Sequence, residues 1–393
     1  MDLASMLQRE DFFPLFFATV KKYYKEVFGQ DVEIDFAEKK DCNLVIKPVL
    51  SAATAPRMSP AARGFFYSEW NVRNSLFKYL AAKAGVTFLT HSGKAFSQFC
   101  FRMTPEKAVT KDLVIAPNNR SIRFFDYESK MVGCMIKDGF TSKYFCNQLE
   151  FRKSHSYPFM LPMLKWGGDW FVEPILNGHP LVRVTKETMY QKGISDALAG
   201  IRMLAEDTLS RVEAEAYVSK MLARIEDFLI DAEKRKKIRT AASTRKLAEN
   251  AEKKVIGTLQ IIPLCGSHGD FQTGNIWVDE NGKTWIYDWE TAGRRSVWYD
   301  SAVLCYSLRR PYGWGELATQ TEPSKLLHCD TKKDYSQSEY AAIKAVVLLE
   351  DILFYLEDML ELPKDWGAEI FDAFIERVEK VTIFDAEVDK WQN

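Results

Sequence analysis

The chain has 393 residues, 47% of them apolar and 13% aromatic, so it can bury more than one sizeable core. Its 53 Lys and Arg nearly balance its 54 Asp and Glu, and the net charge of -1 provides no overall field that would attract nucleic acid or an acidic membrane. The odd number of cysteines, seven, and the lack of a Cys-x-x-Cys pair argue against a disulfide framework and a zinc site. We expect a cytoplasmic protein of two or three lobes, with its partners bound in a cleft.

The N-terminal segment from Met1 to Gly29 is apolar in patches that Arg9, Lys21 and Lys22 interrupt. It therefore fits neither a signal peptide nor a membrane span. The nearly helical spacing of its apolar residues predicts one or two amphipathic helices between residues 3 and 28. After them we expect strands at 32–36 and 43–50, a loop at 51–63, and a helix at 64–84 that Gly85 ends.

Residues 1–105 carry no recognisable motif, and we interpret them as an N-terminal extension or as a modified start of the domain that follows, favouring an addition. From residue 106 onward the pattern changes to an antiparallel meander. Its predicted strands, at 113–116, 122–127 and 131–137, are separated by polar turns. A helix at 142–152 and two further strands, at 159–164 and 170–174, complete this region.

The remainder of the chain is mainly helical, which predicts an α+β protein. Apolar residues recur at spacings of three and four in the predicted helices 187–209, 212–232, 339–360 and 366–378. The basic stretch 233–254 lacks the interleaved aromatic residues of a nucleic-acid site, so we interpret it as a solvated helix face. Residues 311–336 are rich in polar residues and predict a surface insertion.

The stretch 266–290 carries the polar residues that chemistry needs. Asp270 and Asn275 lie five positions apart on a loop with glycines, and Asp288 follows a second apolar strand. An Asp-Glu-Asn-Gly turn at 279–282 joins the two strands, which predicts a β-hairpin. Because both ends of a hairpin emerge on the same side, the three polar residues should lie together.

Such a trio suits phosphoryl transfer, which needs positioning more than covalent help. One carboxylate orients the attacking hydroxyl, while an amide and a second carboxylate hold Mg²⁺ against the phosphates. Mg²⁺ prefers oxygen ligands and is usually bound by one or two carboxylates plus phosphate oxygens. We therefore expect Asp270 to act on the hydroxyl, and Asn275 and Asp288 to bind the metal.

The segments His268 to Asn275 and Ile286 to Glu290 resemble the catalytic loop and metal-binding segment of aminoglycoside phosphotransferases and choline kinase-like enzymes. These are small-molecule relatives of protein kinases, with the same spacing of Asp and Asn. Asp288-Trp289-Glu290 replaces the Asp-Phe-Gly of protein kinases, which favours the small-molecule branch. The resemblance implies a two-lobed protein-kinase-like fold, with an antiparallel N-lobe at 106–176 and a helical C-lobe at 177–393.

The resemblance also implies roles for single residues. Lys137, at the end of a strand, would contact the nucleotide phosphates and would be held by Glu150 from the next helix. Main-chain groups of Glu173 and Ile175, in the linker between the lobes, would face the nucleotide base. His268 would brace the catalytic loop rather than transfer protons. The other implied residues are Glu290, as a further metal contact or a backbone contact, and Asp300, as a helix cap that braces the loop.

The predicted reaction is transfer of the γ-phosphoryl group of ATP or GTP to a hydroxyl of a small acceptor, such as an aminoglycoside, a sugar or an amino alcohol. A Gly-rich phosphate loop is missing, since residues 116–121 contain no glycine. A protein-directed kinase would need an Ala-Pro-Glu-like anchor after Asp288, which the sequence lacks. A pseudokinase or scaffold would have lost one of the three polar residues, and all three are present.

Overall fold

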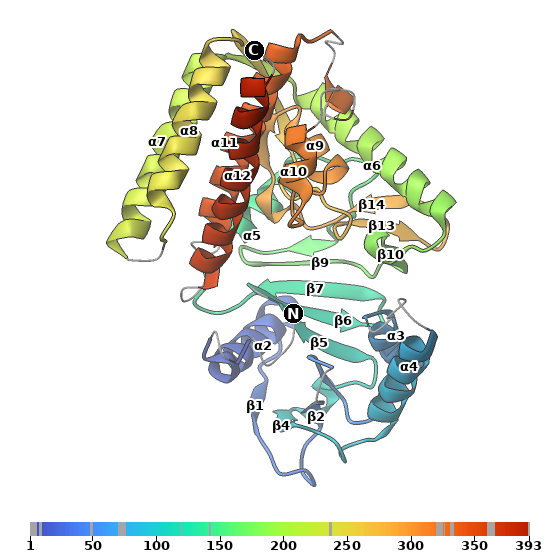
Figure 1. The fold of residues 1–393 in the computed structure, drawn as a ribbon. Helices are drawn as coiled ribbons and strands as arrows, with labels where there is room; N and C mark the ends of the chain where they lie inside the picture. The colour runs from blue at the N-terminus through green and yellow to red at the C-terminus, as the bar shows by residue number, and fades with distance from the viewer. Residues whose placement is uncertain are drawn as a thin grey trace. The chain divides into compact units, whose positions relative to one another are not determined.

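A computed structural model describes residues 6–7, 10–47, 50–69, 76–118, 120–140, 143–235, 238–319, 325, 327–330, 334–359 and 366–391. The chain divides into two compact units, Met1–His179 and Pro180–Asn393. An antiparallel sheet dominates the first unit, and the second is mainly helical (Figure 1). The predicted α+β class is therefore confirmed.

The sheet of the first unit is built by antiparallel pairing throughout its described strands, in the order β1-β4-β2-β3-β5-β6-β7-β9-β8. Its first four strands come from residues 33–104, so this part of the chain is continuous with the sheet that residues 113–174 build. In sheet order the bounds are β1 Glu33–Phe36, β4 Phe99–Thr104, β2 Leu44–Ile46, β3 Ala53–Thr54, β5 Leu113–Pro117, β6 Ser121–Asp126, β7 Met131–Ile136, β9 Trp170–Pro174 and β8 Lys165–Trp166.

Helix α2 (Phe12–Phe28) packs its apolar side on one face of this sheet. The ring of Tyr23 stacks on Phe124 of β6, with 3.7 Å between ring centroids. Gly133 of β7 makes this approach possible, because a Cβ there would lie 2.0 Å from the hydroxyl oxygen of Tyr23. The close contact of α2 with the sheet thus depends on a residue without a side chain.

The opposite face is covered by α3 (Pro60–Glu69), α4 (Leu76–His91) and α5 (Lys143–Ser154). Val114 of β5 packs with α3, while Cys134 and Ile136 of β7 pack with α5. Because neighbouring residues of a strand point to opposite faces, the alternation separates these contacts from those of α2. The same alternation places successive residues of β7 in different cores.

Three predicted elements of this unit are wrong. The loop expected at 51–63 contains β3 and the first residues of α3. The helix expected at 64–84 is described as α3 and α4, on either side of residues 70–75, which lie outside the described part. Helix α4 continues through Gly85 as far as His91. One glycine costs a helix only about 1 kcal/mol, and burial of Val86 in the core offsets that cost. The strand expected at 159–164 is a loop that Pro158 precedes and Pro162 interrupts, since proline cannot donate to a sheet; β8 begins after it.

Long helices form most of the second unit: α6 (Glu187–Thr208), α7 (Ala214–Lys234), α8 (Ala241–Ile256), α11 (Gln337–Met359) and α12 (Trp366–Trp391). Helix α11 packs against α7, α8 and α12. Short strands carry the candidate site, namely β11 (Ser210–Glu213), β12 (Ile261–Ser267) and β15 (Gly293–Ser296) in one sheet and the paired β13 (Ile276–Asp279) and β14 (Thr284–Ile286).

The basic stretch 233–254 forms the end of α7 and most of α8, and its arginines are paired with carboxylates. Arg245 contacts Glu226 and Glu233, and Arg239 contacts Asp372 of α12.

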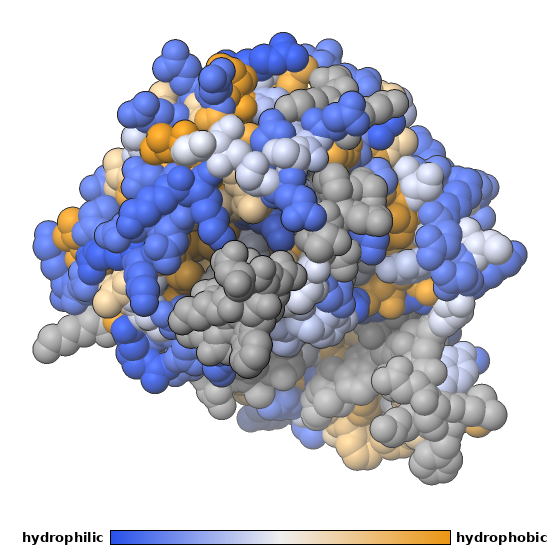
Figure 2. Space-filling view, turned by 45° about the horizontal axis from the view of Figure 1, so that its top comes forward, coloured by the Kyte–Doolittle hydropathy of each residue, from blue (hydrophilic) through white to orange (hydrophobic). Residues whose placement is uncertain are grey.

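Of the predicted insertion 311–336, the described part includes α10 (Gly313–Thr319); residues 320–324, 326 and 331–333 lie outside it. Most of the coloured residues on the face drawn in Figure 2 are hydrophilic, with hydrophobic residues scattered among them. Among the described residues, no helix has the length and apolar character needed to cross a membrane.

Lys47, just after β2, is a charged group in the apolar interior of the first unit. Only 1% of its surface is exposed, and its ammonium donates a hydrogen bond to the backbone oxygen of Leu89 near the end of α4, at 2.5 Å. Burial lowers the pKa of Lys47 to about 8, because desolvation disfavours the charged form. Below that pH the folded protein must keep a buried charge.

Replacement of Lys47 by Met should therefore change stability in a pH-dependent way. Between pH 8 and the unfolded-state pKa near 10.5, the folded protein releases this proton before the unfolded chain does, so wild-type stability recovers as pH rises. The stability of Lys47→Met relative to wild type should fall by about 2 to 3 kcal/mol between pH 7 and pH 10. Denaturant unfolding at both pH values measures this difference.

Lys39 provides the matched control, because it is exposed and also donates to a backbone oxygen, that of Ala95. Lys39→Met should show the same stability difference from wild type at both pH values. Equal pH dependence in the two variants would contradict the burial argument for Lys47.

Candidate active site

The predicted hairpin is present and brings its polar residues to one end. Ile276 of β13 pairs with Ile286 of β14, and the next N–H along, that of Tyr287, donates to the backbone oxygen of Asn275 at 2.8 Å. The turn is closed by a bond of 2.9 Å from the N–H of Gly282 to the oxygen of Asp279. Asn275, which precedes β13, and Asp288, which follows β14, therefore lie at the same end of the hairpin.

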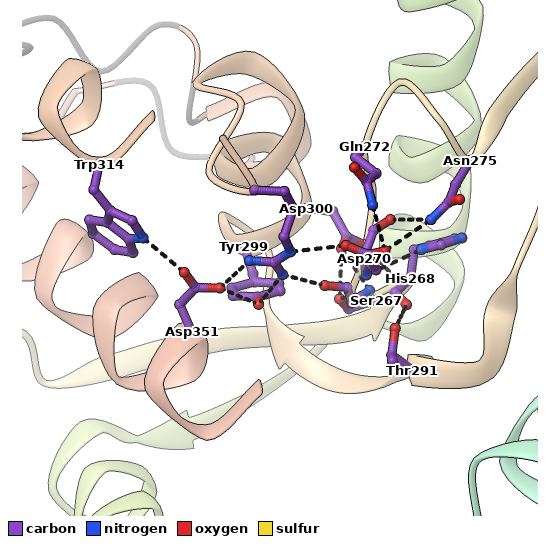
Figure 3. Close-up of polar contacts among 12 residues, drawn as sticks. Ser267, His268, Asp270, Gln272, Asn275, Thr291, Tyr299, Asp300, Trp314 and Asp351 are labelled. Carbon is purple, nitrogen blue, oxygen red and sulfur yellow. Dashed lines mark hydrogen bonds and ion pairs between the residues drawn. The ribbon is translucent and has the colours of Figure 1, made fainter. Parts of the chain in front are cut away.

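Asp270 is held by side chains from three positions (Figure 3). Its Oδ2 accepts bonds from Nε2 of Gln272 at 2.8 Å and from Nδ2 of Asn275 at 3.1 Å. Its Oδ1 accepts a bond from Nε of Arg309 at 2.9 Å. The side chain remains 22% exposed. A carboxylate has about four acceptor positions, so these three bonds orient Asp270 and leave one acceptor position.

The backbone of this loop is fixed by Asp300, which is 4% exposed. Its carboxylate accepts bonds from Oγ of Ser267 at 2.9 Å and from the N–H groups of His268 at 2.7 Å and Gly269 at 3.0 Å. The predicted brace is therefore present. The predicted helix cap is wrong, since α9 (Tyr299–Cys305) begins after Trp298 and Asp300 lies in its first turn, with its carboxylate directed to the loop.

Gly269 is required by its surroundings. Its φ is 85°, and a Cβ there would lie 2.4 Å from the backbone oxygen of Thr291. Only glycine adopts this conformation without strain. The glycine between His268 and Asp270 thus allows the loop to turn against the segment after the hairpin.

His268 is fully buried and acts as a brace. Its Nε2 lies 2.6 Å from the backbone oxygen of Tyr287, and its Nδ1 lies 3.3 Å from the backbone nitrogen of Asp270. Because a carbonyl oxygen only accepts, Nε2 must carry the proton and Nδ1 must accept. His268 therefore connects the loop to the hairpin.

Asn275 and Asp288 are suitable for a cation. Nδ2 of Asn275 donates to two oxygens of Asp270, the backbone O and Oδ2. Oδ1 of Asn275 is therefore the atom that would bind a metal. Asp288 has the left-handed backbone conformation, with φ 65°, which is uncommon outside glycine and typical of functional sites. Both residues are partly exposed.

The described residues include no group of three or more His, Cys, Asp or Glu side chains gathered as a metal cage. Glu290 lies in the turn Trp289–Thr291, and its role as a metal or backbone contact stays a prediction. One carboxylate and one amide fit Mg²⁺ only if phosphate oxygens and water supply its other ligands. That donor set is the one expected for a metal bound with a nucleotide.

Arg309 was not anticipated from the sequence. It lies 39 residues after Asp270, in the segment that follows α9, and its guanidinium is almost completely buried. It also contacts Asp351 of α11, with 2.5 Å between Nη1 and Oδ1. Nothing in the local pattern Leu308-Arg309-Arg310 distinguishes this arginine from its neighbour, so only the tertiary contact identifies it.

The predicted pairing of Lys137 with Glu150 is wrong. The Lys137 ammonium lies 2.5 Å from the carboxylate of Glu10, both side chains are buried, and Glu150 is exposed on α5.

Glu173 uses its side chain in a buried ion pair with Arg152 of α5, at 2.7 Å. The N–H of Ile175 donates to the backbone oxygen of Lys130 at 2.9 Å, so this group is not available to a nucleotide base.

Part of the chain is similar in sequence to a known protein family. The model of the phosphotransferase enzyme family, APH, matches residues 196–322, which include β12, the hairpin and α9. The match confirms the resemblance that the motifs predicted and supports a phosphotransferase. A search of curated proteins found no match.

Similar solved structures include a choline/ethanolamine kinase family protein from Mesorhizobium loti, with 16% identity, a TM-score of 0.44, and coverage of 69% of this chain and 87% of that chain. Plasmodium vivax ethanolamine kinase has 14% identity and a TM-score of 0.47, over 80% of this chain and 90% of that chain. The aminoglycoside phosphotransferase APH(2″)-IIa, solved with gentamicin, has 14% identity and a TM-score of 0.42, over 67% and 88%.

The ion pair of Lys137 and Glu10 leads to a stability prediction. Removal of one partner leaves a buried charge uncompensated, so Lys137→Met and Glu10→Gln should each lower the free energy of unfolding by about 3 kcal/mol. The double variant should lose clearly less than the sum, because the second change removes the uncompensated charge. Denaturant unfolding of the four proteins measures the coupling.

Glu150→Gln is the control, since Glu150 is exposed on α5. Its free energy of unfolding should stay within about 0.5 kcal/mol of wild type. If the free energies of unfolding showed coupling of Lys137 to Glu150 and none to Glu10, the pairing predicted from the sequence would be correct.

Proposed function

We propose that the protein is a kinase that transfers the γ-phosphoryl group of ATP or GTP to a hydroxyl of a small molecule. The observation that carries the proposal is the hydrogen bonding of the Asp270 carboxylate. Three donors orient it, and one acceptor position stays open on a partly exposed side chain. The family match over residues 196–322 supports the same reaction class.

In this proposal Asp270 accepts a hydrogen bond from the acceptor hydroxyl and aims its oxygen at the phosphorus. It also receives the hydroxyl proton as the new oxygen–phosphorus bond forms, while the bond from the γ-phosphorus to the β–γ bridging oxygen breaks and the nucleoside diphosphate leaves with that electron pair. Asn275 and Asp288 would hold Mg²⁺, which neutralises phosphate charge when bound. Lys137 remains the predicted phosphate contact, with Glu10 in place of Glu150 as its partner.

The acceptor class is tested by a screen for acceptor-dependent release of nucleoside diphosphate. Sugars, amino alcohols and aminoglycosides should each be tried with ATP and with GTP, in the presence of Mg²⁺. Stimulation by at least one class of hydroxyl compound supports the proposal. Stable binding of a protein partner without any turnover would instead favour a scaffold.

Asp270→Asn tests the role of the carboxylate. Asparagine keeps the size of the side chain and loses the charge and the ability to receive a proton, so kcat should fall by about 10² or more. The dissociation constant of the Mg²⁺-nucleotide complex should change little. Glu280→Gln, an exposed change in the hairpin turn, should keep wild-type turnover. An Asp270→Asn enzyme within a few-fold of wild type would remove Asp270 from this role.

Metal dependence is tested by thermal unfolding with nucleotide, with and without Mg²⁺. A ligand at a hundredfold its dissociation constant stabilises the folded state by about 2.7 kcal/mol. Mg²⁺ should increase the stabilisation by the nucleotide, and Asp288→Ala should abolish this increase. Glu290→Gln distinguishes a metal contact, which would reduce the increase, from a backbone contact, which would not. A wild-type melting temperature indifferent to Mg²⁺ and nucleotides would falsify the kinase proposal.

A further inference from the structure

A buried row of three charged side chains extends from the catalytic loop to α11. Asp270 contacts Nε of Arg309 at 2.9 Å, and Nη1 of Arg309 contacts Asp351 at 2.5 Å. Exposure of the side chains falls along the row from 22% for Asp270 to 10% for Arg309 and 0% for Asp351. The row therefore begins at the partly exposed carboxylate and ends inside the helical core.

The guanidinium of Arg309 uses all three of its nitrogens. Nη2 donates to the backbone oxygen of Gly269 at 3.0 Å and to the hydroxyl of Tyr299 at 2.9 Å. Arg309 thus contacts both the backbone and the side chain of the catalytic loop. One planar group of fixed geometry therefore determines where Asp270 lies relative to the loop that carries it.

Other contacts hold this arginine in place. Its guanidinium carbon lies 3.8 Å from the ring centroid of Phe354 on α11. Asp351 accepts two further bonds, from the hydroxyl of Tyr299 and from Nε1 of Trp314, each at 2.8 Å. A buried carboxylate with three donors is well satisfied, so Asp351 is a rigid anchor and Arg309 has little freedom to turn.

We propose that Arg309, anchored by Asp351, is a positioning residue for Asp270 in the transfer reaction. This inference rests on the proposed function. Arg309 contributes no atom to the reaction. It keeps Asp270 in the orientation in which the open acceptor position meets the hydroxyl, and it compensates one of two carboxylate charges. Without it Asp270 would turn away from Asp351, and a displacement of about 1 Å can cost about 10² in rate.

The geometry distinguishes arginine from lysine at this position. An ammonium could keep the charge between Asp270 and Asp351, but it cannot reach the four acceptors that Arg309 meets from three nitrogens. Arg309→Lys should therefore lower kcat by about 10 to 10² while the dissociation constant of the Mg²⁺-nucleotide complex stays within about twofold. Tyr299→Phe, which removes one donor to Asp351, should lower kcat by a few-fold.

The adjacent arginine provides a matched control. Arg310 is exposed and donates to the hydroxyl of Tyr312, so Arg310→Lys should have wild-type kcat. Steady-state kinetics with saturating acceptor, nucleotide titration and thermal unfolding should be measured for each variant. If Arg309→Lys does not fold, Tyr299→Phe and Asp351→Asn test the same row with smaller changes, each expected to lower kcat and leave nucleotide affinity unchanged.

The decisive measurement is a double-variant cycle in kcat between Arg309→Lys and Asp270→Asn. If Arg309 acts through Asp270, its replacement should have almost no further effect once Asp270 is Asn. Independent effects that multiply, or equal losses in kcat and nucleotide affinity, would show a general structural role and overturn the inference while the proposed function stands. An absence of transfer by wild type with every acceptor would overturn both.

Discussion

The geometry of the candidate catalytic loop depends on one buried carboxylate, that of Asp300. A buried carboxylate is costly unless donors surround it, and here Oγ of Ser267 and two successive backbone N–H groups supply them. Since the donors belong to consecutive residues, satisfying the charge fixes the backbone of the loop. The turn at Gly269 and the direction of Asp270 then follow from that backbone.

Helix α11 supports the same region through two consecutive acids. Glu350 accepts bonds from the N–H and Oγ of Ser296 in β15, at 2.5 and 2.7 Å, and burial raises its pKa. Asp351 holds Arg309. Each acid is surrounded by donors of other elements, so α11 is fixed against β15 on one side and against the segment after α9 on the other. A helix far along the chain thereby becomes part of the support of the candidate catalytic loop.

The sequence predicted the parts of the site that local pattern determines. The hairpin follows from two short apolar runs and an Asp-Glu-Asn-Gly turn, so the approach of Asn275 to Asp270 was predictable from spacing alone. Arg309, Asp351 and Glu10 were missed because their roles depend on contacts between distant segments. A charged residue on a helix or in a loop usually faces water, and no local signal separates the buried exception from the rule.

The partner of Lys137 shows how strand alternation overrides motif order. Gly133 and Met135 of β7 face α2, whereas Cys134 and Ile136 face α5. Lys137 stands two positions after Met135, so it continues the α2 side, and its partner is Glu10, which precedes α2. The expected glutamate on α5 is on the other face.

Helix α5 is nevertheless tied to the sheet by a buried ion pair. The cation, Arg152, comes from the helix, and the carboxylate, Glu173, comes from the strand β9. A helix glutamate with a strand lysine would make the same connection with the charges exchanged. Either arrangement fixes the helix only if both groups are desolvated together, since one of them alone would be an uncompensated buried charge. The side-chain faces of β7 and β9 determine which residues supply the charges, so the buried pair on α5 is Arg152 with Glu173 and not the predicted Glu150 with Lys137.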